Sequence, residues 1–198
     1  MSALRIVRLA TWALVIALTV ATAVVLWRGD AVPPSTEEVA AIGGPFTLVD
    51  TDGQTVTEKS LAGRPHAIFF GFTHCPEVCP TTLSEISVLV DDLGPDGEKL
   101  DVYFVTVDPE RDDPETIKSY LSSFSGKIEG LTGTEDEVAT ITTAYKVFRR
   151  KVPTDDGDYT MDHSAGVYLF GADGRFRGTI AYGENHDDAL AKLKRLVS

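Results

Sequence analysis

The sequence contains the segment His66-Ala-Ile-Phe-Phe-Gly-Phe-Thr-His-Cys75-Pro-Glu-Val-Cys79-Pro80. It begins as an apolar run and ends as a turn that contains two cysteines, each followed by a proline. An apolar run with almost no polar residue is typical of a strand that is covered on both faces. The residues after the turn have helical spacing, which Gly94-Pro95 ends; they are Leu83, Ile86, Leu89, Val90 and Leu93. The segment therefore predicts a buried strand that passes through a cysteine-containing turn into a helix.

A second strand and a second helix follow in the same order. Leu100–Val107 is another apolar run, which predicts a second buried strand. Asp113-Pro114 is a helix start signal, and the apolar residues after it lie on one helical face; they are Ile117, Tyr120, Leu121 and Phe124. A strand, a helix and another strand in succession predict a parallel crossover.

Two shorter elements flank this unit. Phe46–Val49 and Gln54–Thr57 predict a small hairpin before it, with the turn at Asp50-Thr-Asp-Gly53. Thr134 and Glu137 have the spacing of a capping box and predict the start of a third helix. The residues that we expect to face inward from this helix are Val138, Ile141, Tyr145 and Phe148.

The C-terminal part predicts a second hairpin and a closing helix. Ser164–Phe170 and Arg175–Tyr182 are joined through a glycine-containing turn, and His186–Val197 has its acids first and its cations last, as the helix dipole favours. The complete order predicts an α/β, thioredoxin-like fold with an N-terminal hairpin. In such folds the chemistry lies where the first central strand meets its helix, and the cysteine pair falls there.

The beginning of the chain predicts a membrane anchor. Leu9–Trp27 holds 19 residues without a charge, which at about 1.5 Å per residue nearly span a hydrocarbon core of about 30 Å. Arg5 and Arg8 precede this run, so the positive-inside rule places the N-terminus in the cytoplasm. A cleaved signal peptide is the alternative, because Ala21-Thr22-Ala23 has the small residues that a signal peptidase requires.

We therefore divide the chain into a cytoplasmic N-terminus at 1–8, a transmembrane anchor at 9–27, a flexible tether at 28–43 and a folded domain at 44–198. The tether contains two prolines and a polar stretch, a composition that resists packing. The expected location is a bacterial cytoplasmic membrane, which the chain crosses once, with the C-terminal domain in the periplasm.

The charge of the chain argues against a nucleic-acid partner. Its formal net charge is -12 over 198 residues, whereas binding to a phosphate backbone requires clustered Lys and Arg. The first 28 residues contain three arginines and no acid, so the other 170 residues hold 15 basic and 30 acidic side chains, a net charge of about -15.

Cys75 and Cys79 are the only cysteines, which excludes a disulfide-stapled small domain and a four-thiolate zinc finger. Pro80 suits the first helical position, so we expect Cys79 to be the N-cap and Cys75 to lie on the loop before it. The helix dipole there favours thiolates, which bind metals and attack disulfides. With three intervening residues the pair permits either a disulfide or a metal site with a third ligand; two sulfurs suit Cu(I), although Zn(II) accepts them too.

The third ligand has to come from elsewhere in the chain. His66 opens a buried strand and His186 starts the closing helix, so both have structural interpretations. His74 adjoins Cys75, but the strand direction points it away. His163 lies just before the strand predicted to run beside the first central strand, which would bring it near the cysteines. Asp162 is either its orienting partner or a solvated acid.

Three motifs in order closely resemble the Sco (SenC) family of copper proteins, over about Gly44 to Tyr182. They are Gly71-Phe-Thr-His-Cys75-Pro-Glu-Val-Cys79-Pro80, Val107-Asp-Pro-Glu-Arg-Asp112, and Asp162-His163 before Gly166-Val-Tyr-Leu-Phe170. The resemblance implies a thioredoxin-fold domain with one N-terminal helix. It also implies a role in assembling the copper centres of respiratory oxidases, chiefly the dinuclear copper A site of cytochrome c oxidase subunit II.

Carried over by motif, Cys75 and Cys79 are the thiolate ligands and His163 is the imidazole ligand of Cu(I) or Cu(II). The family commonly has Asp where this chain has Glu77, which keeps the charge. The second motif supplies no copper ligand: we expect a loop salt bridge and a helix lead-in from its charged residues, which are Asp108, Arg111 and Asp112.

The resemblance and the soft ligands favour a copper chaperone, which binds and transfers metal, over an enzyme with turnover. Its expected partners are the oxidase subunit that carries the copper site and a copper donor or thiol reductant protein. A thiol-disulfide reductase that keeps the oxidase cysteines reduced is the alternative, and it has no need of His163. A thiol peroxidase fits poorly, because Thr73 stands two places before Cys75 and not three. We also hypothesise that a polar loop, Arg149–Thr160, lets His163 move on and off the metal.

Overall fold

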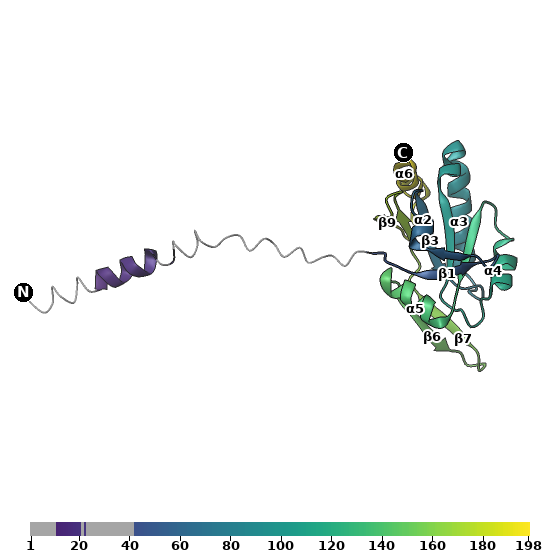
Figure 1. Ribbon diagram of the computed structural model, residues 1–198, viewed down its shortest axis with the longest axis horizontal. Helices are drawn as coiled ribbons and strands as arrows, with labels where there is room; N and C mark the ends of the chain where they lie inside the picture. The colour runs from purple at the N-terminus through teal and green to yellow at the C-terminus, as the bar shows by residue number, and fades with distance from the viewer. Residues whose placement is uncertain (1–10, 21, 23–41) are drawn as a thin grey trace, which may run out of the picture. The chain divides into compact units, whose positions relative to one another are not determined.

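A computed structural model describes residues 11–20, 22 and 42–198 (Figure 1). The chain divides into two compact units, Met1–Ala40 and Ala41–Ser198. In the first unit, residues 11–20 and 22 are helical; the predicted N-terminus at 1–8, both flanks of the predicted anchor and residues 28–41 of the predicted tether lie outside the described residues. Within the described part, no helix is both long and apolar enough to cross a membrane.

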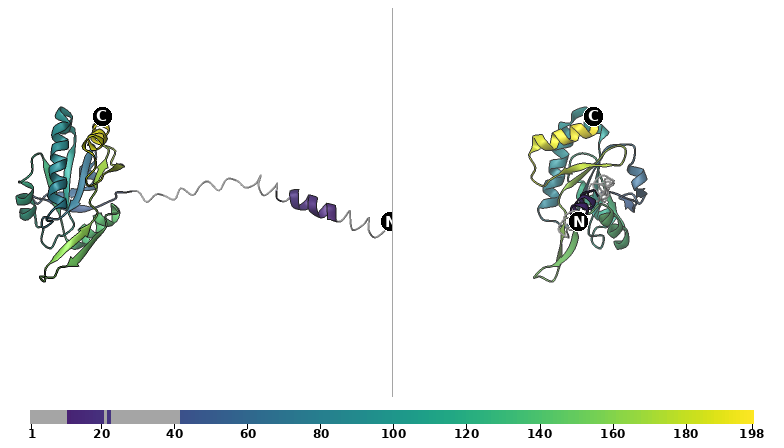
Figure 2. Two further views of the ribbon diagram at one scale, coloured as in Figure 1. Left: turned by 180° about the vertical axis from the view of Figure 1, so that it is seen from behind. Right: turned by 90° about the vertical axis from the view of Figure 1, so that its left-hand side faces the viewer.

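The second unit is built on a seven-stranded sheet with the order β2-β1-β5-β4-β3-β8-β9 (Figures 1 and 2). Its strands are β1 Thr47–Asp50, β2 Thr55–Thr57, β3 His66–Gly71, β4 Asp101–Thr106, β5 Ile128–Thr132, β8 Val167–Phe170 and β9 Phe176–Ile180. The helices are α2 Glu58–Leu61, α3 Val78–Asp92, the 3-10 helix η1 Gly94–Lys99, α4 Pro114–Leu121, α5 Glu135–Ala144 and α6 His186–Val197. Each strand and helix that the sequence predicted for the folded domain at 44–198 is present within a few residues of its expected bounds.

The centre of the sheet is parallel, as the predicted crossover requires. Strand β3 pairs with β4, and β4 pairs with β5, in parallel, whereas β8 joins the other edge of β3 in the antiparallel sense. Every residue of β3 is buried, which is the environment that its continuous apolar run predicted. Helices α3 and α6 pack side by side, α4 packs against β5, and α5 packs against β1.

Strand β5 is an element that the sequence analysis missed. Glu129 and Gly130 interrupt its short apolar pattern, so it does not read as a strand. Gly130 is buried because Ile117 of α4 occupies the space where a Cβ would stand. This close approach of helix and strand explains a glycine inside a strand.

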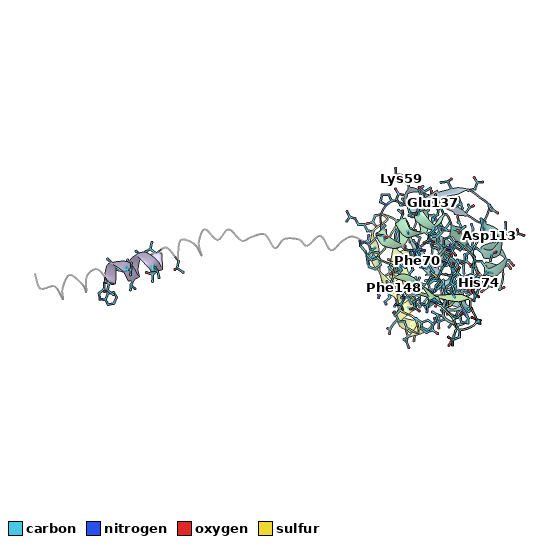
Figure 3. The ribbon with its side chains drawn as sticks, turned by 90° about the horizontal axis from the view of Figure 1, so that it is seen from below. Lys59, Phe70, His74, Asp113, Glu137 and Phe148 are labelled. Atoms are coloured by element: carbon cyan, nitrogen blue, oxygen red, sulfur yellow. The ribbon has the colours of Figure 1, made fainter. Side chains whose placement is uncertain are left out.

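Two local predictions were wrong. Helix α3 begins at Val78 with Glu77 as its N-cap, so Cys79 is the second helical residue and not the cap. Pro80 is tolerated there because the N–H groups of a first helical turn have no partner inside the helix. Phe148 was expected to face inward, but α5 ends at Ala144, and this side chain is 56 % exposed (Figure 3).

The segment expected to be a polar loop, Arg149–Thr160, is mostly a two-stranded antiparallel ribbon. Strand β6 covers Arg149–Pro153 and β7 covers Tyr159–His163, with Arg149 opposite His163. Four charged residues in the two strands hide the strand signal, because both strands of the ribbon present much of their length to solvent; they are Arg149, Arg150, Lys151 and Asp162. The hypothesis that this segment lets His163 move on and off the metal stays untested, and it now applies to a ribbon and not to a loop.

Candidate metal centre

The three predicted ligand residues meet where β3 and β7 end and where α3 begins. Cys75 lies on the turn after β3, Cys79 lies in the first turn of α3, and His163 is the last residue of β7. One ligand atom from each residue can be chosen so that all three lie within 4.8 Å of one another. The Cys79 Sγ stands 3.6 Å from the His163 Nε2. The expected approach of His163 to the cysteine pair is thus confirmed, while its role as a ligand stays a prediction.

The two cysteines have different electrostatic surroundings. Cys75 is partly exposed, and its Sγ accepts a hydrogen bond from the backbone N–H of Cys79 at 3.3 Å. Hydrogen bonding by the Cys79 thiol is the main cause that lowers the pKa of Cys75 to about 4. The same hydrogen bond, with complete burial, raises the pKa of Cys79 far above its ordinary value. At neutral pH these shifts favour the thiolate at Cys75 and the thiol at Cys79.

The His163 ring presents its Nε2 to the sulfurs because its other nitrogen is already used. Its Nδ1 lies 2.9 Å from the Ser164 carbonyl oxygen, and because a carbonyl can only accept, Nδ1 must carry the hydrogen. Nε2 is then the free ligand atom. Phe72 packs edge-on against the ring, with centroids 5.8 Å apart.

Of the two alternatives for Asp162, the structure shows the solvated acid and not the partner that orients the imidazole. Its carboxylate pairs with Arg150 at 2.5 Å on the outer face of the ribbon, since alternate residues of a strand point to opposite faces. The Ser164 carbonyl does the orienting instead. Because this partner is a backbone atom, no side-chain pattern in the sequence could have identified it.

The other three histidines have partners outside the cluster, in agreement with the sequence analysis. His66 is buried and stacks on Phe170, with centroids 5.2 Å apart. His186 pairs with Asp92 at 2.9 Å. His74 is half-exposed, and its Nδ1 lies 3.0 Å from the Thr73 hydroxyl.

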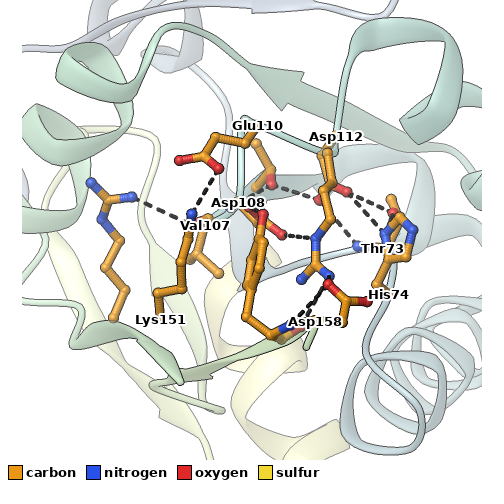
Figure 4. A network of polar contacts seen from close by, with 12 residues as sticks. Thr73, His74, Val107, Asp108, Glu110, Asp112, Lys151 and Asp158 are labelled. Carbon is orange, nitrogen blue, oxygen red and sulfur yellow. Dashed lines mark hydrogen bonds and ion pairs between the residues drawn. The ribbon is translucent and has the colours of Figure 1, made fainter. Parts of the chain in front are cut away.

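The second motif folds into a polar network beside the cysteine turn (Figure 4). The expected loop salt bridge is confirmed, with the Arg111 Nε 2.5 Å from an Asp108 carboxylate oxygen. Asp112 does more than lead into a helix: its fully buried carboxylate accepts from the Thr73 N–H and hydroxyl and from the Thr106 hydroxyl. Burial raises the pKa of Asp112. These bonds fasten the chain two residues before Cys75, a role that sequence reasoning missed.

The donor set suits a soft metal ion. Two sulfurs and one imidazole nitrogen are ligands that Cu(I) accepts, and Zn(II) binds the same atoms. Both cysteines are free, so the same sulfurs are also available for disulfide chemistry. The geometry supports metal binding and thiol exchange at one place.

Comparison with known proteins gives a consistent match. The family model described as SCO1/SenC matches residues 34–198. The chain is 41 % identical over 150 residues to the mitochondrial protein SCO1 homolog 1 of Arabidopsis thaliana. That match covers 75 % of this chain and 44 % of the Arabidopsis protein, so the chain spans less than half the length of this relative.

Solved structures agree with the sequence match. The structure of Bradyrhizobium japonicum ScoI with copper bound is 53 % identical and superposes with a TM-score of 0.73, covering 79 % of this chain and 99 % of that one. BsSco, described as a member of the Sco family of cytochrome c oxidase assembly proteins with a disulfide switch, is 26 % identical with a TM-score of 0.64, covering 80 % and 95 %. These structures confirm the thioredoxin-like α/β fold predicted for the domain.

Proposed function

This chain belongs to the SCO1/SenC family, and from that premise we propose that it binds copper and delivers it during cytochrome c oxidase assembly, to the copper A site of subunit II. The observation that carries the proposal is the convergence of Cys75, Cys79 and His163, whose ligand atoms lie within 4.8 Å. A copper-bound relative at 53 % identity supports the choice of metal.

The site suggests an order for metal transfer. Cys79 is buried, whereas Cys75 and His163 are partly exposed. A thiolate or imidazole of the partner protein can therefore approach from the side of the exposed ligands. A neutral imidazole carries no charge to hold Cu(I), so His163 is the first ligand to be replaced. The two sulfurs release the ion afterwards, and Cys79 takes up again the proton that it lost when the ion bound.

A second function is supported by the asymmetry of the two cysteines. The Cys75 thiolate is exposed enough to attack a partner disulfide, which gives a mixed disulfide and releases one partner thiolate. Cys79 then loses its proton and attacks the Cys75 sulfur, which releases the second partner thiolate and leaves a Cys75–Cys79 disulfide. The chain is oxidised and the partner reduced by two electrons. A reductase of this kind keeps the oxidase cysteines ready for copper, and the disulfide switch of BsSco supports it.

We further propose that residues 9–27 anchor the chain in a bacterial cytoplasmic membrane, with the domain in the periplasm. The uncharged run and the arginines before it support this orientation. The partners that we propose are the oxidase subunit and a copper donor or thiol reductant protein. Cleavage at Ala21-Thr22-Ala23 remains the competing hypothesis for the first 27 residues.

Comparison of the wild type with His163→Ala tests the function. In the detergent-solubilised full chain we expect one Cu(I) per wild-type molecule, and an affinity loss of at least about tenfold in the variant, by competition with a chromophoric chelator. His186→Ala is the matched control, because this histidine pairs with Asp92 away from the site. Copper binding that is equal in all three proteins, together with rapid disulfide reduction, would favour the reductase.

A further inference from the structure

The ribbon that carries His163 is not part of the main sheet. Among the residues that the structure describes, β7 pairs only with β6. Successive side chains of a strand point to opposite faces, so Tyr159, Met161 and His163 share one face of β7. This face is turned toward the domain, because Met161 is buried whereas Asp162, on the other face, is exposed. Contacts of these inward side chains must therefore set the angle of β7 against the domain.

The contact at the far end of β7 is a closed triangle of Asp108, Arg111 and Tyr159. The Arg111 guanidinium lies 3.7 Å above the Tyr159 ring and donates to the Tyr159 carbonyl at 3.0 Å. Its Nε pairs with Asp108, and the Tyr159 hydroxyl donates to the other Asp108 oxygen at 2.9 Å. Each residue contacts both others, and the Arg111 and Asp108 side chains are only 17 % and 2 % exposed.

The triangle reaches the metal centre through Phe72. The Arg111 guanidinium lies 5.9 Å from the Phe72 ring centroid, and the His163 ring meets the same ring edge-on. Phe72 is buried and directly follows β3. Arg111 and His163 thus share one rigid neighbour.

One nitrogen of the Arg111 guanidinium is in an environment that does not favour the stability of the fold. Its Nη2 is buried and has no hydrogen-bond partner within the described part of the chain, although buried donors are normally satisfied. An arginine kept in such a place calls for another explanation. Besides its pair with Asp108, Arg111 contacts Asp158 and Tyr159 at the start of β7 and the Phe72 ring beside His163.

We propose that Arg111 and Tyr159 are positioning residues for His163, and that their contact fixes β7 so that the imidazole faces the two sulfurs. Tyr159 stands about 13 Å from His163 along the strand, at about 3.3 Å per residue. Because metal-ligand distances tolerate only about 0.2 Å, a small tilt of the ribbon at Tyr159 would spoil the site. The consequence for copper rests on the proposed function; the positioning itself does not.

Two conservative variants test this in the full chain. Tyr159→Phe keeps the ring but loses the bond to Asp108, and Arg111→Lys keeps the charge but loses the planar fork. Both are expected to weaken the nuclear Overhauser contact between the His163 and Phe72 rings in metal-free protein, and to lower Cu(I) affinity about tenfold. Arg64→Lys is the matched control, because Arg64 also binds a carboxylate and a carbonyl, at the opposite end of β3.

A double-mutant cycle separates positioning from general stability. In a His163→Ala background, Arg111→Lys should cause no further loss of copper affinity, because the residue that it positions is gone. A further loss of the same size, or an unchanged ring contact in Arg111→Lys, would overturn the proposal. If wild-type protein binds no copper, the proposed function fails, and the ring contact in metal-free protein still decides whether Arg111 positions His163.

Discussion

Cys75 and Cys79 lie four positions apart at the start of α3, and the fold gives them different reactivities. The partly exposed Cys75 sulfur accepts the Cys79 N–H, while the Cys79 sulfur is completely buried. Helix N-termini favour anions through their free N–H groups and their dipole. Cys75 is therefore suited to receive a metal ion or a disulfide first.

This difference predicts how alkylation depends on pH. Only the thiolate reacts, and the pKa of Cys75 is lowered to about 4, so modification of Cys75 by iodoacetamide should stay fast at neutral pH and slow only as the pH falls through about 4. Cys79, with its raised pKa and complete burial, should remain unmodified. Mass spectrometry of the alkylated peptide measures both sites.

Cys79→Ala is the control for the cause of this shift. It removes the thiol that hydrogen-bonds the Cys75 thiolate, so the midpoint for Cys75 should move upward, toward the ordinary thiol value of about 8.5. The folded pKa of Cys75 is below the unfolded one, so the thiolate stabilises the wild-type fold at pH values above the ordinary thiol pKa. That contribution is lost as the pH falls toward about 4. A wild-type midpoint already near 8.5 would contradict the assignment.

The junction of β3 and α3 shows how tightly two elements enclose the site. Gly71 ends β3, and a Cβ placed on it would lie 2.8 Å from Phe104 and 3.0 Å from both Phe69 and the Cys79 Sγ. All three neighbours are fully buried and cannot move away. The glycine is thus required by the close approach of Phe104, Phe69 and Cys79 and not by its own backbone conformation.

Gly71→Ala should therefore affect stability and metal binding together. Overpacking typically costs about 1–3 kcal/mol, which a lower urea midpoint would register, and displacement of the Cys79 sulfur should weaken Cu(I) binding. Gly166→Ala is the matched control, because its Cβ would meet atoms only at 3.5 Å and 3.8 Å. The free energy of unfolding of this control should change by less than about 0.5 kcal/mol, which leaves its urea midpoint almost unchanged. Equal midpoints for the two variants would contradict this account of the junction.

At the scale of the whole molecule, the uneven charge distribution connects the domain to its proposed location. The chain has a net charge of -12, yet its first 28 residues carry three arginines and no acid. Two of these arginines, Arg5 and Arg8, precede the uncharged run, and the positive-inside rule favours keeping them on the cytoplasmic side.

The full chain, expressed in bacteria, should stay with the membranes after a carbonate wash, and its domain should be digested by protease added to spheroplasts. Ile16→Arg should reduce insertion, because an arginine at the centre of a span costs about 2.5–3.5 kcal/mol. A soluble product whose N-terminus begins after Ala23 would instead establish cleavage of a signal peptide.

Local sequence patterns determined much of this molecule. Burial on both faces leaves a continuous apolar run, which identified β3 and β4, and capping chemistry placed the starts of α4 and α5 at Asp113 and Thr134. The spacing of Cys75 and Cys79 at a strand-to-helix turn marked the reactive segment. These features depend on neighbours within a few residues, so a single sequence carries them.

Long-range packing decided the rest. His163 is 84 positions from Cys79, and it reaches the sulfurs because β8 pairs beside β3 and because the ribbon ends at that edge. Strand β5, the ribbon and the network of Asp112 escaped prediction, since polar residues or glycine interrupt their apolar pattern and their roles depend on partners distant in the chain. A contact between distant residues depends on strand order and on side-chain packing, and neither leaves a periodic trace in the sequence.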